Sequence, residues 1–445
     1  MTFKISRRDF VTKGLAASAC FGMGSVSAMP ILTRTSGELI KRNGKRRVVV
    51  AGGGWGGLSA ARHLRALAPD LEVIVLERNP FFWSCPLSNK WLIDVVQTDM
   101  LAHSYLLAAQ QFGYTFVQTE IVDIDRATRR VHTADGWLDY DWLIIAGGIR
   151  YAFEPWFGED VQTARYTKDR FASAYIPSAE HAYLKHKIQN FKGGTIVMTL
   201  PPPPHRCPPS PYERACLMAW WFKHHKVPAK IIILDPKPNV APITIGYQKA
   251  FEELYSDIIT YVPNATIREV DPYNKIVKTA AGDFRFDDAI LMTPHQAADL
   301  VWKADLIGKN EQGKATGWAD VDPLYFNRKE DPQVFVIGDS VGQVSIYFRH
   351  YPKSGHVANR QARLVAQYIA AQAAGHEPKF EMIDNLCFML VNNEPKQAIA
   401  VRFTYEYGAD EEIHQTAVDD NVRRSELWQA DLDWANAMFK DFLYR

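Results

Sequence analysis

Two cysteines, Cys85 and Cys207, lie in segments where a thiol could be reactive. Cys85 opens the run Cys85-Pro86-Leu87-Ser88-Asn89, and Cys207 lies in a proline-rich stretch, residues 201–209. A thiolate is a nucleophile that bonds to carbon and exchanges with other sulfur atoms. What each thiol can react with depends on the elements that surround it.

The residues before Cys85 form a complete dinucleotide-binding pattern. Residues 46–51 predict a buried strand, residues 52–57 read Gly-Gly-Gly-Trp-Gly-Gly, and an apolar helix follows. The motif glycines are Gly52, Gly54 and Gly57. They allow a tight turn, the approach of a pyrophosphate and close packing of helix on strand. The next strand, residues 73–76, ends at Glu77, whose carboxylate could bind an adenosine ribose, so the unit predicts FAD or NAD.

Two later segments favour FAD over NAD. Residues 140–148 read as a strand that ends in glycines, Gly147 among them. Residues 334–339 read as another strand, ending in Gly338 and Asp339. The first is similar to the segment that returns the chain to the FAD domain in flavoproteins with two dinucleotide domains. The second is similar to the segment whose aspartate binds the ribityl chain. Because Cys85 directly follows the first unit, it could be tied covalently to the flavin.

The N-terminus predicts export. Residues 6–10 read Ser-Arg-Arg-Asp-Phe, a twin-arginine motif, and a Gly/Ala-rich apolar stretch leads to a small-residue site at Ala28. That stretch is shorter than the roughly twenty residues that a spanning helix needs. We therefore expect residues 1–28 to be a cleaved signal peptide and the mature chain to be periplasmic, without a membrane span.

Composition narrows the possible partners. The chain has 445 residues, 47% of them hydrophobic, which is enough to bury two or three cores. A formal net charge of +1 without a long basic block gives no support for nucleic-acid binding. The cysteines outside the predicted signal peptide are Cys85, Cys207, Cys216 and Cys387. The sequence has no CxxC, no CxxCH and no metal-type Cys/His cluster, so no metal site is predicted and any haem must come from another chain.

The remaining pattern predicts an α/β fold with two Rossmann-like dinucleotide-binding-type domains, as in glutathione reductase, and a C-terminal segment. Residues 46–165 and 292–375 are expected to form a discontinuous FAD-binding domain, and residues 166–291 the second domain. In an NAD-using protein, a glycine-rich loop would follow the strand at residues 194–200. The prolines found there have no N–H to offer a pyrophosphate, which argues against NAD(P)H binding. Residues 376–445 could cover the flavin or dock a partner.

With these residues in view, the chain resembles the flavoprotein subunit of flavocytochrome c sulfide dehydrogenase, a relative of the sulfide:quinone reductases. The most specific segments are residues 85–89, residues 206–215 (Arg-Cys-Pro-Pro-Ser-Pro-Tyr-Glu-Arg-Ala), Gly338-Asp339 and Pro352-Lys353-Ser354-Gly355. The resemblance implies that Cys85 carries FAD through a thioether and that Cys207 is half of a redox-active disulfide attacked by sulfide. It also implies that Glu213 is a base and that electrons pass to a c-type cytochrome subunit.

The residues around Gly355 should bind or influence the flavin. Ser354 could cap the helix that follows, and in this fold the N-terminus of that helix faces the pyrimidine end of the flavin. Its dipole, and a charge on Lys353, would favour the anionic reduced form. A solvated loop lysine is the alternative for Lys353.

Two departures from the family pattern suggest altered chemistry. The partner of Cys207 is expected near residues 317–322, where this chain has Ala319, so the usual disulfide is predicted to be absent. Cys216 or Cys387 could replace this partner, but sequence motifs give little support to either cysteine. The segment 340–351 is also longer than the family pattern and could reshape the substrate pocket.

The leading hypothesis is an exported FAD-dependent dehydrogenase that oxidises sulfide or another small sulfur donor and passes electrons to a cytochrome c. The alternative, motivated by Ala319, is an electron-transfer or structural subunit that has lost the sulfide reaction. A third reading, an NAD(P)H dehydrogenase, is disfavoured by the proline loop.

Overall fold

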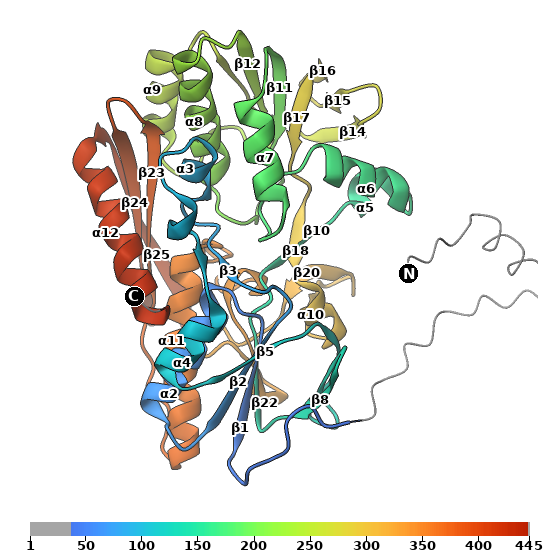
Figure 1. The fold of residues 1–445 in the computed structure, drawn as a ribbon, viewed down its shortest axis with the longest axis vertical. Coiled ribbons are helices and arrows are strands. Elements are labelled where there is room, and N and C mark those ends of the chain that lie inside the picture. The colour runs from blue at the N-terminus through green and yellow to red at the C-terminus, as the bar shows by residue number, and fades with distance from the viewer. Residues whose placement is uncertain (1–36, 444–445) are drawn as a thin grey trace, which may run out of the picture. The chain divides into compact units, whose positions relative to one another are not determined.

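A parallel sheet forms the core of the first domain in the computed structural model, which describes residues 37–443 (Figure 1). Its strand order is β21-β22-β9-β1-β2-β5. The bounds are β21 (Asn327–Arg328), β22 (Asp331–Val336), β9 (Trp142–Ile145), β1 (Arg47–Ala51), β2 (Glu72–Glu77) and β5 (Thr115–Gln118). All pairs are parallel except β21 with β22. The order joins strands from both halves of the sequence, because β22 comes from beyond the second domain.

Both faces of this sheet are covered. Val48 and Val50 of β1 pack with helices α2 (Trp55–Leu67) and α11 (Gly355–Ala374) in one apolar cluster. Val49 and Ala51 point the other way, toward the antiparallel strands β6 (Ile121–Asp125), β7 (Arg130–Thr133) and β8 (Gly136–Asp139). This alternation within an entirely buried strand is the period-2 pattern of a sheet covered on both sides.

A second parallel sheet forms the core of the next domain. Its order is β13-β12-β11-β17, with bounds β13 (Ile259–Val262), β12 (Ala229–Leu234), β11 (Gly194–Thr199) and β17 (Asp288–Leu291). Helices α7 (Glu180–Gln189), α8 (Ser210–His224) and α9 (Thr244–Leu254) belong to this domain, and the three strands β14 (Ile267–Asp271), β15 (Ile276–Thr279) and β16 (Gly282–Arg285) extend it. The prediction of an α/β fold with two Rossmann-like domains is confirmed.

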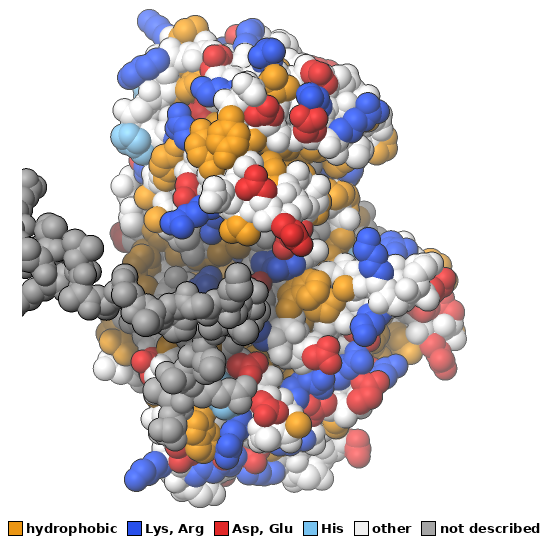
Figure 2. Space-filling model, turned by 90° about the vertical axis from the view of Figure 1, so that its right-hand side faces the viewer, with side chains coloured by type: hydrophobic (Ala, Val, Ile, Leu, Met, Phe, Trp, Pro, Cys, Tyr) orange, Lys and Arg blue, Asp and Glu red, His pale blue; other side chains and the backbone are white. Residues whose placement is uncertain are grey.

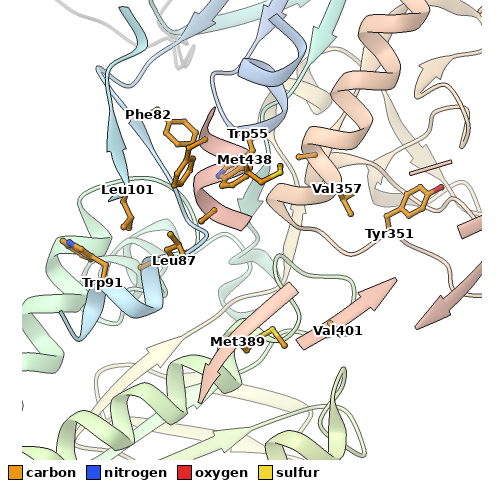
Figure 3. Packing of buried hydrophobic residues seen from close by; sticks show 14 of the residues in the cluster. Trp55, Phe82, Leu87, Trp91, Leu101, Tyr351, Val357, Met389, Val401 and Met438 are labelled. Atoms are coloured by element: carbon orange, nitrogen blue, oxygen red, sulfur yellow. The ribbon is translucent and has the colours of Figure 1, made fainter. Parts of the chain in front are cut away.

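The chain ends in an antiparallel sheet with a helix beside it (Figure 1). The strands are β23 (Asp384–Asn392), β24 (Gln397–Tyr407) and β25 (Ile413–Arg424), and the helix is α12 (Ser425–Phe442). Figure 3 shows side chains of this segment, Met389, Val401 and Met438 among them, in the cluster that also holds Trp55 and Phe82 of the first domain. The C-terminal segment therefore shares its core with the nucleotide-binding half.

The other elements connect these layers. They are β3 (Phe82–Trp83), α3 (Ser88–Leu92), η1 (Thr98–Met100), β4 (Ala102–His103), α4 (Tyr105–Phe112), β10 (Ile149–Tyr151), α5 (Glu154–Phe157), α6 (Val161–Arg170), β18 (His295–Ala297), α10 (Asp299–Lys303), β19 (Ile307–Lys309), β20 (Ala315–Ala319) and η2 (Gly338–Ser340). Acidic and basic side chains are interspersed over the face shown in Figure 2. Among residues 37–443, no helix is long and apolar enough to cross a membrane. The predicted signal peptide, residues 1–28, lies outside the described residues.

Candidate functional site

A deep cavity lies at the carboxyl ends of the central strands of the first sheet. Gly54 after β1, Gly148 after β9 and Asp339 after β22 all line it. This edge of a parallel sheet, where loops and helix N-termini converge, is where open α/β sheets bind ligands. The C-terminal segment closes the cavity from the other side, since Met389 of β23 and Trp434 of α12 also line it.

The glycines of the first turn fit a dinucleotide. Gly52 has φ +113°, and a Cβ on it would lie 2.6 Å from the carbonyl oxygen of Ala146. A Cβ on Gly57 would lie 1.8 Å from the carbonyl oxygen of Gly52, so α2 can approach β1 only with glycine there. A Cβ on Gly54, in contrast, would meet nothing within 4 Å, and Gly54 lines the cavity. The turn therefore keeps an open backbone surface that a pyrophosphate can approach.

Two further predicted cofactor residues, Glu77 and Gly147, lie outside the cavity. Glu77 Oε2 accepts a hydrogen bond of 2.9 Å from the backbone N–H of Gly53, and its Oε1 accepts from the backbone of Asn79. A Cβ on Gly147 would lie 2.8 Å from Cβ of Ala298, where the two halves of the first domain meet. Glu77, Gly147 and the buried Gly52 and Gly57 are not among the residues that line the cavity.

Asp339 lies in the cavity and holds Arg206. The Asp339 carboxylate, at the start of η2, pairs with Nε of Arg206, and Nη1 of Arg206 donates to the carbonyl of Tyr175. Arg206 is the residue before Cys207, so this ion pair ties the loop of the second domain to the first domain. Because these partners hold the buried Arg206 guanidinium, its positive charge has a fixed position in the cavity.

Cys85 lies in the same cavity, directly before α3. Its Sγ lies 3.7 Å from the carbonyl oxygen of Tyr175 and 3.9 Å from Nη1 of Arg206. Burial raises the pKa of the thiol, and the Arg206 charge acts in the opposite direction. Cys85 lines the cavity, and its covalent link to the flavin stays a prediction.

Cys207 lies at the boundary between this cavity and a second one. It has φ +50°, in the left-handed region, and its N–H donates to the carbonyl of Lys353 at 2.9 Å. Its own carbonyl accepts from the N–H of Ser210 at 3.0 Å, where α8 begins. The residue lines both cavities. These backbone contacts fix the position of a thiol whose pKa is raised by burial.

Cys387 is the second thiol at this boundary. It lies on β23, lines the same two cavities as Cys207, and accepts a hydrogen bond of 3.4 Å from Nδ2 of Asn385. Burial raises its pKa to about 11. Its charge is also, after burial, the largest contribution to the raised pKa of Cys207. Two free thiols from segments 180 positions apart in the sequence thus line the same two cavities.

This pairing changes the expectation drawn from Ala319. Ala319 is buried at the end of β20 and lines the second cavity only, while Cys216 is fully buried within α8 and lines neither cavity. No motif surrounds Cys387, so sequence patterns offer little support for it as the partner of Cys207. In the structure, Cys387 is the cysteine that shares both cavities with Cys207 among the described residues.

Glu213 belongs to a buried ionic cluster. One carboxylate oxygen accepts from Nζ of Lys90 at 2.8 Å and from the backbone N–H of Leu390 at 2.9 Å, and the other accepts from Nδ2 of Asn89 at 2.9 Å. Lys90 also contacts Asp431 of α12 at 2.8 Å. The cluster joins α3, α8, β23 and α12 around the cavity. Glu213 pairs with Lys90, and its role as a base stays a prediction.

Lys353 is buried between the two cavities. Its Nζ donates to the carbonyls of Asp339 and Val341, both at 2.8 Å, and lies 3.8 Å from the ring centre of Trp318. Burial lowers its pKa to about 7. It is therefore not a solvated loop lysine. The predicted cap is confirmed, because Oγ of Ser354 accepts from the N–H of Val357 at the start of α11.

Gly355 and the inserted segment complete the site. Gly355 lines the first cavity, and a Cβ on it would lie 2.7 Å from the Trp55 ring. Residues 347–351 of the longer segment line the second cavity. None of these five residues lines the first cavity.

The second domain is not built to hold a nucleotide in the usual way. Prolines follow β11 at the turn that would face a pyrophosphate. The carboxylate after β12, Asp235, is fully buried and accepts hydrogen bonds from Tyr212, Tyr261 and Lys237. An acid so engaged has little capacity left for a ribose.

The fold and site define a dinucleotide-binding flavoprotein of the disulfide-oxidoreductase class. Residues 46–189 match the family model described as pyridine nucleotide-disulphide oxidoreductase, which implies FAD. The solved sulfide:quinone oxidoreductase from Aquifex aeolicus superposes with a TM-score of 0.70 at 20% identity, covering 89% of this chain and 91% of that one. At this identity the likeness shows the fold.

More specific matches identify the family. Residues 182–294 match the model for the central part of the flavoprotein chain of sulfide dehydrogenase (flavocytochrome c). The flavoprotein chain of that enzyme from Chlorobaculum thiosulfatiphilum is 50% identical over 46 residues, 10% of this chain and 96% of the relative. The sulfide-quinone reductase of Aquifex aeolicus is 25% identical over 252 residues, 54% of this chain and 55% of the relative's length. The chain belongs to the family of flavocytochrome c sulfide dehydrogenase flavoprotein chains.

Proposed function

We propose that this chain oxidises sulfide, or a closely similar small sulfur compound, with a Cys207–Cys387 pair next to FAD. The observation that carries the proposal is that both thiols line the dinucleotide cavity and, on their other side, the second cavity. A donor in the second cavity can thus reach the sulfur atoms without entering the first.

The chemistry follows from thiol–disulfide exchange. Hydrosulfide attacks the disulfide form of the pair, so that one S–S bond breaks as another forms, leaving a persulfide on one cysteine and a thiolate on the other. The sulfur atom that entered is thereby oxidised by two electrons, and its proton leaves. Bound FAD supplies the acceptor for these two electrons and can release them one at a time.

The chain's own residues prepare this step. The Cys207 N–H bond to Lys353 holds one thiol in place, and Asn385 holds the other. Lys353, with a pKa near 7, can hold or release a proton in the wall that the two cavities share. Asp339, Gly54 and Cys85 line the cavity. In this proposal Asp339 and Gly54 bind the ribityl and pyrophosphate parts of the cofactor, and Cys85 holds it covalently.

Location and partner complete the proposal. The twin-arginine motif supports export of the folded holoprotein to the periplasm. The family name of the Chlorobaculum relative supports a c-type cytochrome as electron acceptor on a separate chain. The alternative of a subunit without sulfide chemistry is not favoured, because Cys387 removes the observation that motivated it.

Anaerobic stopped-flow mixing with sulfide tests the proposal. The visible absorbance of the flavin should bleach in the wild type and in Cys216→Ala, whose thiol lines neither cavity. Bleaching should be lost, or slowed by orders of magnitude, in both Cys207→Ser and Cys387→Ser. Normal bleaching in Cys387→Ser would show that Cys387 is not the partner. Failure of the wild type to bleach would reject sulfide as the donor.

A further inference from the structure

The Cys85 thiol has two nitrogen neighbours that the sulfide reaction does not use. Its Sγ lies 3.9 Å from Nη1 of Arg206 and 4.0 Å from Nε2 of His181. These groups come from different elements, since His181 lies in α7 and Arg206 in the loop before α8. Together with the Tyr175 carbonyl at 3.7 Å, they surround the sulfur on the cavity side.

The Arg206 charge is suited to stabilise a thiolate. Only the thiolate is an effective nucleophile, and burial alone disfavours it at Cys85. The guanidinium is itself fixed by Asp339 and by the Tyr175 carbonyl, so its position beside the sulfur does not depend on the flavin. A fixed charge costs no reorganisation when the thiol ionises.

His181 is suited to orient the thiol. It is 1% exposed, packs beside the ring of Trp83, and burial lowers its pKa to about 3, so the imidazole is neutral. A neutral imidazole can accept a hydrogen bond at Nε2, 4.0 Å from the sulfur, and so direct the thiol within the cavity.

We propose that Arg206 and His181 activate Cys85 as the nucleophile that bonds to the 8α-methyl carbon of FAD, so that the chain attaches its own cofactor. The inference rests on the covalent link included in the proposed function. It adds the residues that form this link, and it predicts that no separate attachment enzyme is needed.

The attachment step balances without other protein groups. The S–H bond and one C–H bond of the 8α-methyl group break, and a C–S bond forms. The thiol proton and the methyl proton pass to the isoalloxazine, which takes up two electrons and two protons in all. Dioxygen or the one-electron acceptor of the proposed reaction then reoxidises the cofactor.

Covalent flavin can be measured separately from activity. The full chain, made in flavin-depleted form, is mixed with FAD at a series of pH values. Covalent flavin is measured as the fluorescence that stays with the denatured protein after acid precipitation. Total bound flavin is measured before the precipitation. The variants are Arg206→Gln, Arg206→Lys and His181→Gln. Matched controls are Arg150→Gln, a half-buried arginine that binds Gln296, and His186→Gln, an exposed histidine of α7.

The expected result is slower attachment with unchanged total flavin. Each pKa unit lost in thiolate stabilisation reduces the thiolate fraction about tenfold, so we expect Arg206→Gln to attach at least tenfold more slowly near neutral pH. Its rate should recover as pH rises, because solvent then deprotonates the thiol. Arg206→Lys should keep much of the wild-type attachment rate. His181→Gln should attach flavin more slowly than the wild type even though Arg206 is still present.

Three outcomes would overturn the inference. Wild-type rates in Arg206→Gln and His181→Gln would show that neither residue activates Cys85. A slower rate with an unchanged pH profile would show a purely structural effect. Complete release of flavin from the wild type would reject covalent attachment itself, whereas bleaching by sulfide in that same preparation would leave the sulfide proposal intact.

Discussion

Asp431→Asn should change how stability depends on pH. Asp431 is buried in α12 beside Lys90, and burial raises its pKa from 3.8 to about 6 despite the lysine. A carboxyl group whose pKa is higher in the folded state binds its proton more tightly there. It therefore destabilises the folded chain above about pH 6, and this cost disappears as the pH falls toward 3.8.

The size of the effect follows from the shift. At about 1.4 kcal/mol per pKa unit, a rise from 3.8 to about 6 corresponds to about 3 kcal/mol. Asparagine has the same shape as aspartate, but its side chain does not titrate. The free energy of unfolding of Asp431→Asn should thus increase relative to that of the wild type by up to about 3 kcal/mol between pH 4 and pH 7, which means a more stable variant at the higher pH.

Denaturant titrations of the holoprotein across this pH range measure the difference. Asp433→Asn is the matched control, because Asp433 is exposed on the same helix and binds only Gln429 among the contacts recorded for the described residues. That variant should track the wild type at every pH. A difference between Asp431→Asn and wild type that is the same at all pH values would refute the reasoning.

Three other results are expected. Lys353→Met should flatten the pH dependence of the flavin midpoint potential near pH 7, measured by redox titration. In the wild type, Lys353 loses a charge that favours the reduced cofactor as the pH rises through its pKa of about 7, whereas methionine carries no charge at any pH. Glu213→Gln should lower the free energy of unfolding by about 3 kcal/mol in denaturant titrations, since it breaks a buried pair with Lys90. NADH should fail to bleach the flavin under anaerobic conditions, because the proline turn after β11 cannot donate to a pyrophosphate; rapid bleaching would show that a nucleotide binds elsewhere.

Local patterns predicted most of the fold and the cofactor cavity. The glycines around Gly54, the strand ending at Glu77 and the Gly338-Asp339 pair each carry their signal within a few residues, because the turn needs those residue types itself. Ser354 likewise caps α11 through a contact three residues away. Such features depend on short-range geometry that a single sequence displays.

Residues brought together from distant segments were harder to predict. Cys387 lines the same cavities as Cys207 because β23 packs against α8, and no motif around Cys387 indicates that packing. The same holds for Glu213, whose carboxylate is held by Lys90 and by the backbone of β23.

The cofactor cavity is closed by segments far from its dinucleotide turn in the sequence. β23 and α12 supply Leu390, Asp431 and Trp434 around a site whose turn lies more than three hundred residues earlier. Because β22 and α11 also come late in the chain, the first sheet and its cover are completed within a few tens of residues of each other. Removing the cover would leave the cavity open on the side of Asp431 and Trp434. Truncation before residue 384 should yield a chain that exchanges its flavin, unless the bond to Cys85 has already formed.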